Sequence, residues 1–256
     1  MKRFLAFTQK ELLEQFRSGK LLFLGILFLL FGIMNPAVAK LTPWLLEMMT
    51  DSLAQSGMTI TQFTVNALDS WVQFFKNIPM ALIAFVLMEG SIFTREYQTG
   101  TLVLGLTKGL PRPTVVISKT LVLTLLWSLG YWLCFMITYS YNAYFWDNAI
   151  AHSLMFSVVC WWVFGLWVIC LAVLFSVLFT GNTGVLLGTG VVVLICYLLG
   201  FFPNVSKYLP TYLAEGNSLI YGLNDATNYS AALAITSIMC IGCFVASISI
   251  FNKKPL

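Results

Sequence analysis

A long interval without charge constrains the fold of this chain more than any other feature of its sequence. From Ser153 to Phe202 there is no Asp, Glu, Lys or Arg. A transmembrane helix needs about 20 predominantly apolar residues, so this interval is too long for a single crossing. The polar, glycine-rich TGNTG at Thr180–Gly184 divides it. The sequence therefore predicts two membrane-spanning helices here, at 153–179 and 184–202.

The whole chain has the composition of an integral membrane protein. Of its 256 residues, 59% are hydrophobic and 9% are charged, whereas soluble domains have about 45–50% and about 25%. Because so few charged side chains cannot cover the apolar ones, lipid must contact most of the surface. We expect a single all-α domain, residues 1–256, with six transmembrane helices. They are predicted at 21–39, 77–93, 115–141, 153–179, 184–202 and 230–251.

The distribution of Lys and Arg predicts the orientation. With six spans, both termini share a side with the second and fourth connectors, and cytoplasmic loops carry the excess of Lys and Arg. Eleven basic residues fall on that side and three on the other. Both termini and segment 94–114 are therefore expected in the cytoplasm, and 40–76 and 203–229 outside. The eleven are Lys2, Arg3, Lys10, Arg17, Lys20, Arg95, Lys108, Arg112, Lys119, Lys253 and Lys254; the three are Lys40, Lys76 and Lys207.

Residues 1–20 are predicted to form an amphipathic helix at the inner membrane interface, because apolar and charged side chains fall on opposite arcs. The basic region before the first apolar run is too long for a signal peptide, so we expect an uncleaved first span. The apolar arc holds Leu5, Leu12, Leu13 and Phe16, and the charged arc Arg3, Lys10, Glu14 and Arg17.

The two external segments are long enough to contain structure of their own. Thr42-Pro43 is typical of a helix start. Pro203 and Pro210 favour a re-entrant or surface-lying hairpin in the second segment. In the first, helical spacing predicts a further short helix through Ile60, Phe63, Ala67, Trp71 and Phe75.

The motifs of soluble catalytic chemistry are missing. There is no G-x-x-x-x-G-K-[ST], so the chain has no P-loop for ATP, and G-x-S-x-G and H-E-x-x-H are also absent. His152 is the sole histidine. We expect no catalytic site, bound metal or bound cofactor, and the cysteines, which lie mostly in apolar runs, are expected to pack as small hydrophobes.

Three residues within the spans leave alternatives open. Glu89 is the only acidic residue inside a predicted span. It is either a functional intramembrane carboxylate or a boundary ion pair near Arg95. Gly184 and Gly188 form a G-x-x-x-G, whose small residues allow helix backbones to approach closely. They mark either packing within the chain or a seam between two protomers.

The segment TREYQTGTLVLGLTKGLPRPTVVISK, at 94–119, carries a resemblance to a known family. This segment follows a basic N-terminal helix and the first two predicted spans. It contains the motif E-x-x-x-G-T-L and then the motif L-P-R-P-x-x-x-x-x-K. In this order, and with six spans, the chain resembles the permeases of type-2 ABC exporters. It departs from many relatives in the turn, which here reads TKGLPRP. The residues that match are Glu96, Gly100, Thr101, Leu102, Leu110, Pro111, Arg112 and Lys119.

The resemblance implies that 94–114 is a coupling segment that docks on a separate ATPase. Thr101–Leu104 would offer an apolar knob, and Arg95, Glu96 and Arg112 would offer charge; an exposed apolar patch usually has a partner. Leu102→Asp is then expected to prevent ATPase binding without preventing insertion. The rival interpretation is basic anchoring to anionic lipid.

The resemblance also implies partners and an activity. Two ATPase copies would supply ATP and Mg²⁺, and a second copy or a homologous permease would complete the membrane unit in a bacterial plasma membrane. No nucleic acid is expected as a partner. The expected substrate is hydrophobic or amphipathic, such as an antimicrobial peptide or a drug, and aromatic residues of the third span are candidates for its path. The alternatives are a non-catalytic immunity or assembly module and an ion-coupled secondary transporter. The third-span candidates are Trp127, Tyr131, Trp132, Phe135, Met136 and Tyr139.

Overall fold

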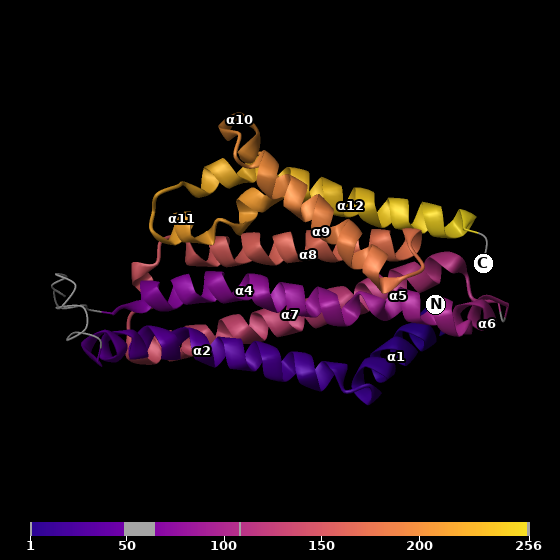
Figure 1. Ribbon diagram of the computed structural model, residues 1–256, viewed down its shortest axis with the longest axis horizontal. Coiled ribbons are helices and arrows are strands. Elements are labelled where there is room, and N and C mark those ends of the chain that lie inside the picture. Colours follow the sequence, from indigo (N-terminus) through magenta and orange to yellow (C-terminus); the bar gives the residue numbers. More distant parts are fainter. Residues whose placement is uncertain (1, 49–64, 108, 255–256) are drawn as a thin grey trace.

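The computed structural model describes residues 2–48, 65–107 and 109–254. Its described part is helical, and six of these helices are long and apolar enough to cross a membrane, as the sequence predicts (Figure 1). The spanning helices are α2 (Lys20–Met48), α4 (Ala67–Glu89), α7 (Arg112–Phe145), α8 (Leu154–Leu178), α9 (Asn182–Leu199) and α12 (Ser230–Lys253). The others are α1 (Lys2–Arg17), α5 (Ser91–Thr99), α6 (Thr101–Thr107), α10 (Pro203–Ser206), α11 (Gly216–Ile220) and the 3₁₀ turns Asn148–Ile150, Pro210–Ala214 and Ala226–Tyr229.

The first helix, α1, lies at the same end of the bundle as α5 and α6, the two helices that form the connector between α4 and α7. Figure 1 shows both chain ends, α1, α5 and α6 at one end of the bundle, and α11, the last turn of α2 and the first turn of α4 at the other. This is the arrangement that an even number of spans requires. By the excess of Lys and Arg, the end with α1, α5 and α6 is the one expected in the cytoplasm.

The first external segment differs from the expectation of separate short helices. Helix α2 continues to Met48, and both Pro36 and Pro43 lie inside it. The predicted helix start at Thr42-Pro43 is therefore wrong. Trp71 and Phe75 belong to α4 itself, which begins with Asn66 as its cap in a capping box. Residues 49–64, with Ile60 and Phe63, lie outside the described residues.

The second external segment folds back onto the bundle. The backbone N–H of His152 donates to the carbonyl of Ile220 (3.1 Å), and the Ser157 hydroxyl donates to the carbonyl of Gly216 (3.1 Å). A side chain at Gly216 would place its Cβ 2.5 Å from the ring of Phe75. This hairpin therefore closes the end of α4 and α8, and its glycine permits the close approach.

The core is aromatic and centres on α7 and α8. Trp71, Trp127 and Tyr131 are fully buried. The indole of Trp127 lies against α8, where a Cβ at Gly165 would be 2.3 Å from it. Ring pairs contribute about 0.5–1.5 kcal/mol each beyond their buried area. The third-span aromatics Trp127, Tyr131 and Phe135 are thus packed against neighbouring helices, so the expectation that they line a path is wrong for these three.

The spans are buried to very different extents. The most apolar window of α8 is 61% buried, whereas those of α9 and α12 are 17% and 11% buried. Helix α8 is therefore the centre of the bundle, whereas few residues of α9 and α12 are fully buried.

A chain of amides joins three spans inside the bundle. The Asn35 side chain on α2 donates to Thr138 Oγ1 on α7 (3.0 Å), and Asn77 on α4 donates to Asn35 Oδ1 (2.8 Å). Asn35 and Thr138 are fully buried. In hydrocarbon these groups have no water to bond, so the chain fixes the register of α2, α4 and α7.

Candidate functional site

Helix α1 packs on the bundle through its polar side chains. Thr8, Glu11 and Gln15 are buried, whereas Leu5 and Phe16 are 61% and 72% exposed. The buried residues lie three and four positions apart, which places them on one helix face. The buried face is therefore the polar strip Thr8, Glu11 and Gln15, and both the predicted charged arc (Lys10, Glu14 and Arg17) and the predicted apolar arc stay exposed.

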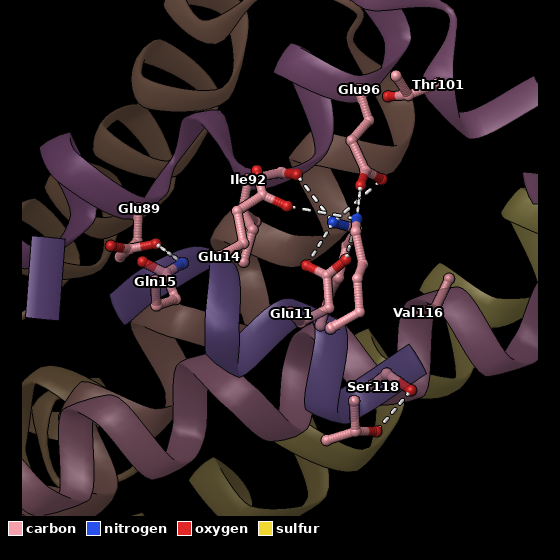
Figure 2. Close-up of polar contacts among 12 residues, drawn as sticks. Glu11, Glu14, Gln15, Glu89, Ile92, Glu96, Thr101, Val116 and Ser118 are labelled. Carbon is pink, nitrogen blue, oxygen red and sulfur yellow. Dashed lines mark hydrogen bonds and ion pairs between the residues drawn. The ribbon is translucent and has the colours of Figure 1, made fainter. Parts of the chain in front are cut away.

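Lys119, in the second turn of α7, is the centre of this contact. Its Nζ lies 2.8 Å from Glu11 Oε2 and 3.1 Å from Glu96 Oε2, and it donates to the carbonyl of Ile92 (3.1 Å). Lys119 is 1% exposed. It therefore does not extend to the lipid headgroups, as a lysine near the end of a span often does. It joins α1, α5 and α7 in a buried ion pair (Figure 2).

Lys10 closes the same cluster from its outer side. Its Nζ lies 2.7 Å from Glu96 Oε1, 3.0 Å from Glu11 Oε1 and 3.3 Å from Glu14 Oε2. Burial lowers the pKa of Lys10, but the Glu96 hydrogen bond and the charge of Glu11 outweigh it and raise that pKa above its ordinary value. We call these five residues the ion cluster: Lys10, Glu11, Glu14, Glu96 and Lys119.

The ion cluster holds three carboxylates, those of Glu11, Glu14 and Glu96, and one oxygen of each lies within 4.8 Å of one oxygen of the other two. Such a group is suited to a divalent cation. Here the ammonium groups of Lys10 and Lys119 already take the positions between the carboxylates. Within the described residues, the arrangement is therefore that of an internal salt bridge rather than a metal centre.

Glu89, the last residue of α4, has partners that sequence did not identify. It accepts a hydrogen bond from Gln15 Nε2 (2.7 Å), and its Oε2 lies 3.4 Å from Lys20 Nζ. It is 2% exposed. An ion pair is present, as one alternative held, but the expected partner was wrong, since Arg95 is exposed on α5. Glu89 ties α4 to α1 and to the start of α2.

The connector forms two short helices around one glycine. Gly100 ends α5 with φ +69°, a left-handed conformation that favours glycine. In α6, Thr101 is exposed, Leu102 is 4% exposed and Val103 is 43% exposed. The prediction that Leu102 is an outward knob is therefore wrong, because Leu102 packs into the core. Among the described side chains of α6, Thr101, Val103 and Thr107 are exposed.

The segment after α6 is held by the C-terminal end of α12. Pro111 precedes α7, and Arg112 Nη1 donates to the carbonyls of Asn252 (2.9 Å) and Lys254 (2.7 Å). Lys254 Nζ in turn donates to the carbonyl of Val177 at the end of α8 (2.6 Å). Arg112 thus caps a helix end rather than presenting a free charge. Leu110 is half-buried against the core.

The two glycines of the G-x-x-x-G lie against side chains of their own chain. A Cβ at Gly184 would be 2.8 Å from the ring of Phe179, and one at Gly188 would be 2.6 Å from the ring of Phe175. These contacts favour packing of α9 on α8 over a seam between protomers.

Comparison with known proteins gives one distant relative. The chain is 23% identical over 252 residues to the uncharacterized transmembrane protein YxlG of Bacillus subtilis (strain 168), and the match covers 95% of this chain and 96% of that protein. No family model matches. The likeness runs along the full length of both chains, and it agrees with a multi-pass membrane protein of this size.

The sequence analysis did not predict that Glu11, Gln15 and Lys20 are partners of Lys119 and Glu89. Their signal was present but weak. A lysine one turn inside an apolar helix needs an acidic partner when it is buried. The only nearby acidic residues are those of α1, α5 and the end of α4.

Proposed function

We propose that this chain is the membrane-spanning permease subunit of an ATP-driven exporter of the type-2 ABC class, in a bacterial plasma membrane. It works with a second copy or a homologous permease and two cytoplasmic ATPase subunits. Three observations support the proposal. The chain has six candidate spans, its sequence has no P-loop motif of its own for ATP, and its connector resembles that of type-2 ABC permeases.

The observation that carries the proposal is the ion cluster. Helices α5 and α6 form the connector, and Glu96 on α5 is bonded to Lys119 on α7 and to Lys10 on α1. A force applied to the connector by a partner therefore reaches a spanning helix through short, charge-assisted bonds. A connector that served only to anchor the chain to lipid would not need this link.

The surface for a partner is the outward side of α5 and α6. Arg95, Thr101 and Val103 are exposed there. An exposed apolar residue on the same two helices as an exposed cation and a hydroxyl suits a groove on a soluble protein. The ion-coupled alternative would rely on Glu89, whose Oε2 is engaged by Gln15 and Lys20 and whose Oε1 is buried without a hydrogen-bond partner.

The test is recovery of an ATPase with the full-length chain. Tagged protein is purified from the membranes of its native host, and P-loop ATPases are identified by mass spectrometry. We expect one with the wild type and about a tenfold loss in Val103→Asp. Leu223→Asp, on a 76% exposed residue at the opposite end, is the control and keeps the ATPase. Recovery of the wild type without any P-loop ATPase would contradict the proposal.

A further inference from the structure

An apolar groove of about 390 Å³ lies between α4, α8 and α9. Along α9 its lining runs from Leu186 to Tyr197, which is about 16 Å at 1.5 Å per residue. This length is about half the thickness of the hydrocarbon of a bilayer. Ile83 on α4 and Leu194 on α9 line the groove and are 60% and 57% exposed, so it opens toward the bilayer. Its shape suits an alkyl chain that lies along the helices.

The lining offers an occupant one accessible polar side chain, at one end. Trp161 Nε1 and Thr189 Oγ1 are buried, so neither atom meets an occupant. The third lining residue with a polar side chain, Tyr197, is 46% exposed. It lies two residues before the end of α9, where the chain enters the second external segment. The groove is therefore apolar along its length and has a hydroxyl and an aromatic ring at this end.

The second external segment brings a carboxylate to the same end. Thr211 Oγ1 donates to the carbonyl of Cys196 on α9 (3.4 Å), and a serine of α8 donates to the carbonyl of Gly216 (3.1 Å). These two bonds hold the segment against both helices that line the groove. Glu215 lies between them in the chain, and its charge acts on the hydroxyl of Tyr197. The end of the groove thus combines a carboxylate with a tyrosine.

Glu215 has no cationic partner in the part of the chain that the structure describes. Its side chain is exposed, and no Lys or Arg there forms a salt bridge with it. Partial burial raises the pKa of this carboxyl above its ordinary value. A bound cation would offset that desolvation, and aromatic rings beside a carboxylate also attract an ammonium group. The site is therefore open to a cation from outside the chain.

The connectors at this end of the bundle favour a cation as well. Segments 40–76, 146–153 and 203–229 together hold six acidic residues and three lysines. An excess of one sign of charge raises the local concentration of ligands of the opposite sign. An anionic amphiphile is correspondingly disfavoured. The six acidic residues are Glu47, Asp51, Asp69, Asp147, Glu215 and Asp225.

We propose that this groove binds a cationic amphiphile with one alkyl chain. The chain lies along α4, α8 and α9, and the ammonium group lies at the Glu215 carboxylate and against the ring of Tyr197. The inference rests on the proposed function only in naming this class of molecule as the substrate. The binding itself needs no ATPase.

The test uses the full-length chain in phosphatidylcholine nanodiscs and two tritiated probes of one shape. Dodecyltrimethylammonium is a cation, and 2,2-dimethyltetradecane has a carbon atom in place of its nitrogen. Binding above that of empty nanodiscs should saturate for the cation. Its affinity should exceed that of the uncharged isostere by about threefold to tenfold, the range that an exposed ion pair and a cation–π contact supply together.

Two variants separate the carboxylate from the groove. Glu215→Gln should weaken binding of the cation by about threefold to tenfold and leave the isostere unchanged, because only the charge is removed. Gly190 lines the groove, and a Cβ there meets nothing within 4 Å. Gly190→Leu should therefore occupy the groove and abolish saturable binding of both probes.

Each variant has a matched control. Asp225→Asn removes one exposed acidic charge from the same external segment, and Asp225 is not in the lining. Gly242 on α12 has the same open space as Gly190. Asp225→Asn and Gly242→Leu should bind both probes as the wild type does.

Three results would overturn the proposal. Equal affinity of the wild type for the two probes would assign the groove to uncharged acyl chains of the bilayer. An equal loss in Glu215→Gln and Asp225→Asn would assign the preference to the general charge of this end. Absence of saturable binding, or binding that survives Gly190→Leu, would remove the groove as the site. Because ATPase recovery is measured separately, each of these results leaves the proposed function standing.

Discussion

Two regions of the molecule use their polar side chains in opposite ways. Where α1, α2, α4 and α7 meet, polar groups bond from one helix to another, as in Lys119–Glu11 and Asn35–Thr138. In α12, hydroxyls bond within the helix, as when Thr236 donates to Ala232 and Ser247 donates to Cys243. Directional bonds between helices fix their register, whereas apolar contacts in lipid allow sliding. We call the first region the held region, because side chains bond its helices to one another; α12 is instead bonded to α7 through backbone carbonyls at its C-terminal end, which accept from Arg112.

The largest effect is expected from Lys119→Met, which removes the cation at the centre of the held region. Glu11 and Glu96 would stay buried with only Lys10 beside them. Breaking one side of a buried pair costs about 3–5 kcal/mol in the free energy of unfolding. SDS titration in mixed micelles measures this. Changing Glu11 and Glu96 to Gln as well should restore most of the loss, and a triple variant as unstable as the single would refute the charge argument.

A smaller effect is expected from Asn35→Leu. This change removes the two hydrogen bonds that join α2 to α4 and α7. Interhelical hydrogen bonds in membranes average about 0.6 kcal/mol, with a maximum of about 1.7. The free energy of unfolding should therefore fall by about 1–2 kcal/mol in the same titration. An unchanged value would mean that register in this region is set by packing alone.

A matched pair of threonines tests the comparison most directly. Thr138 donates both within α7 and to the carbonyl of Gly32 on α2, whereas the Thr236 hydroxyl donates within α12. Thr138→Val should lower the free energy of unfolding by about 1 kcal/mol. Thr236→Val should change it by less than about 0.5 kcal/mol. Equal losses would show that the two regions do not differ in the way described.

The smallest effect concerns pH. The pKa of Lys10 is raised in the folded chain, so its contribution is present in full below its ordinary value of 10.5 and is lost only as the pH rises beyond it. The difference in thermal midpoint between wild type and Lys10→Gln should stay constant from pH 7 to about pH 10 and shrink above that. Lys10 is half exposed, so the difference itself should be small. A difference that changed below pH 9 would assign the stabilisation to another group.

The spans were predictable because hydropathy alone sets them. The six apolar runs correspond to six helices, but the helix boundaries differ from those predicted. Helix α4 begins earlier because Asn66 caps it, and α2 ends later because the helix continues through Pro43. The connector also has its break at Gly100, where the backbone requires glycine.

The site could not be predicted in the same way because it depends on which way adjacent residues turn. Leu102 and Val103 are neighbours in a seven-residue helix, and both are aliphatic. Only the packing of α6 on the rest of the chain buries Leu102 and exposes Val103. Likewise, the burial of Lys119 follows from the docking of α1, a contact between residues 108 positions apart.

Helix α1 turns Glu11 toward the bundle and Leu5 and Phe16 away from it, so a lipid leaflet at the expected inner interface would contact those two apolar side chains. A change in that leaflet, such as in its headgroup charge or thickness, would therefore act first on Leu5 and Phe16, which are 61% and 72% exposed. The ion pair between Glu11 and Lys119 would then transmit the displacement of α1 to α7. The surrounding membrane would then act on α7 through the ion cluster, which is also the contact that the proposed soluble partner would use.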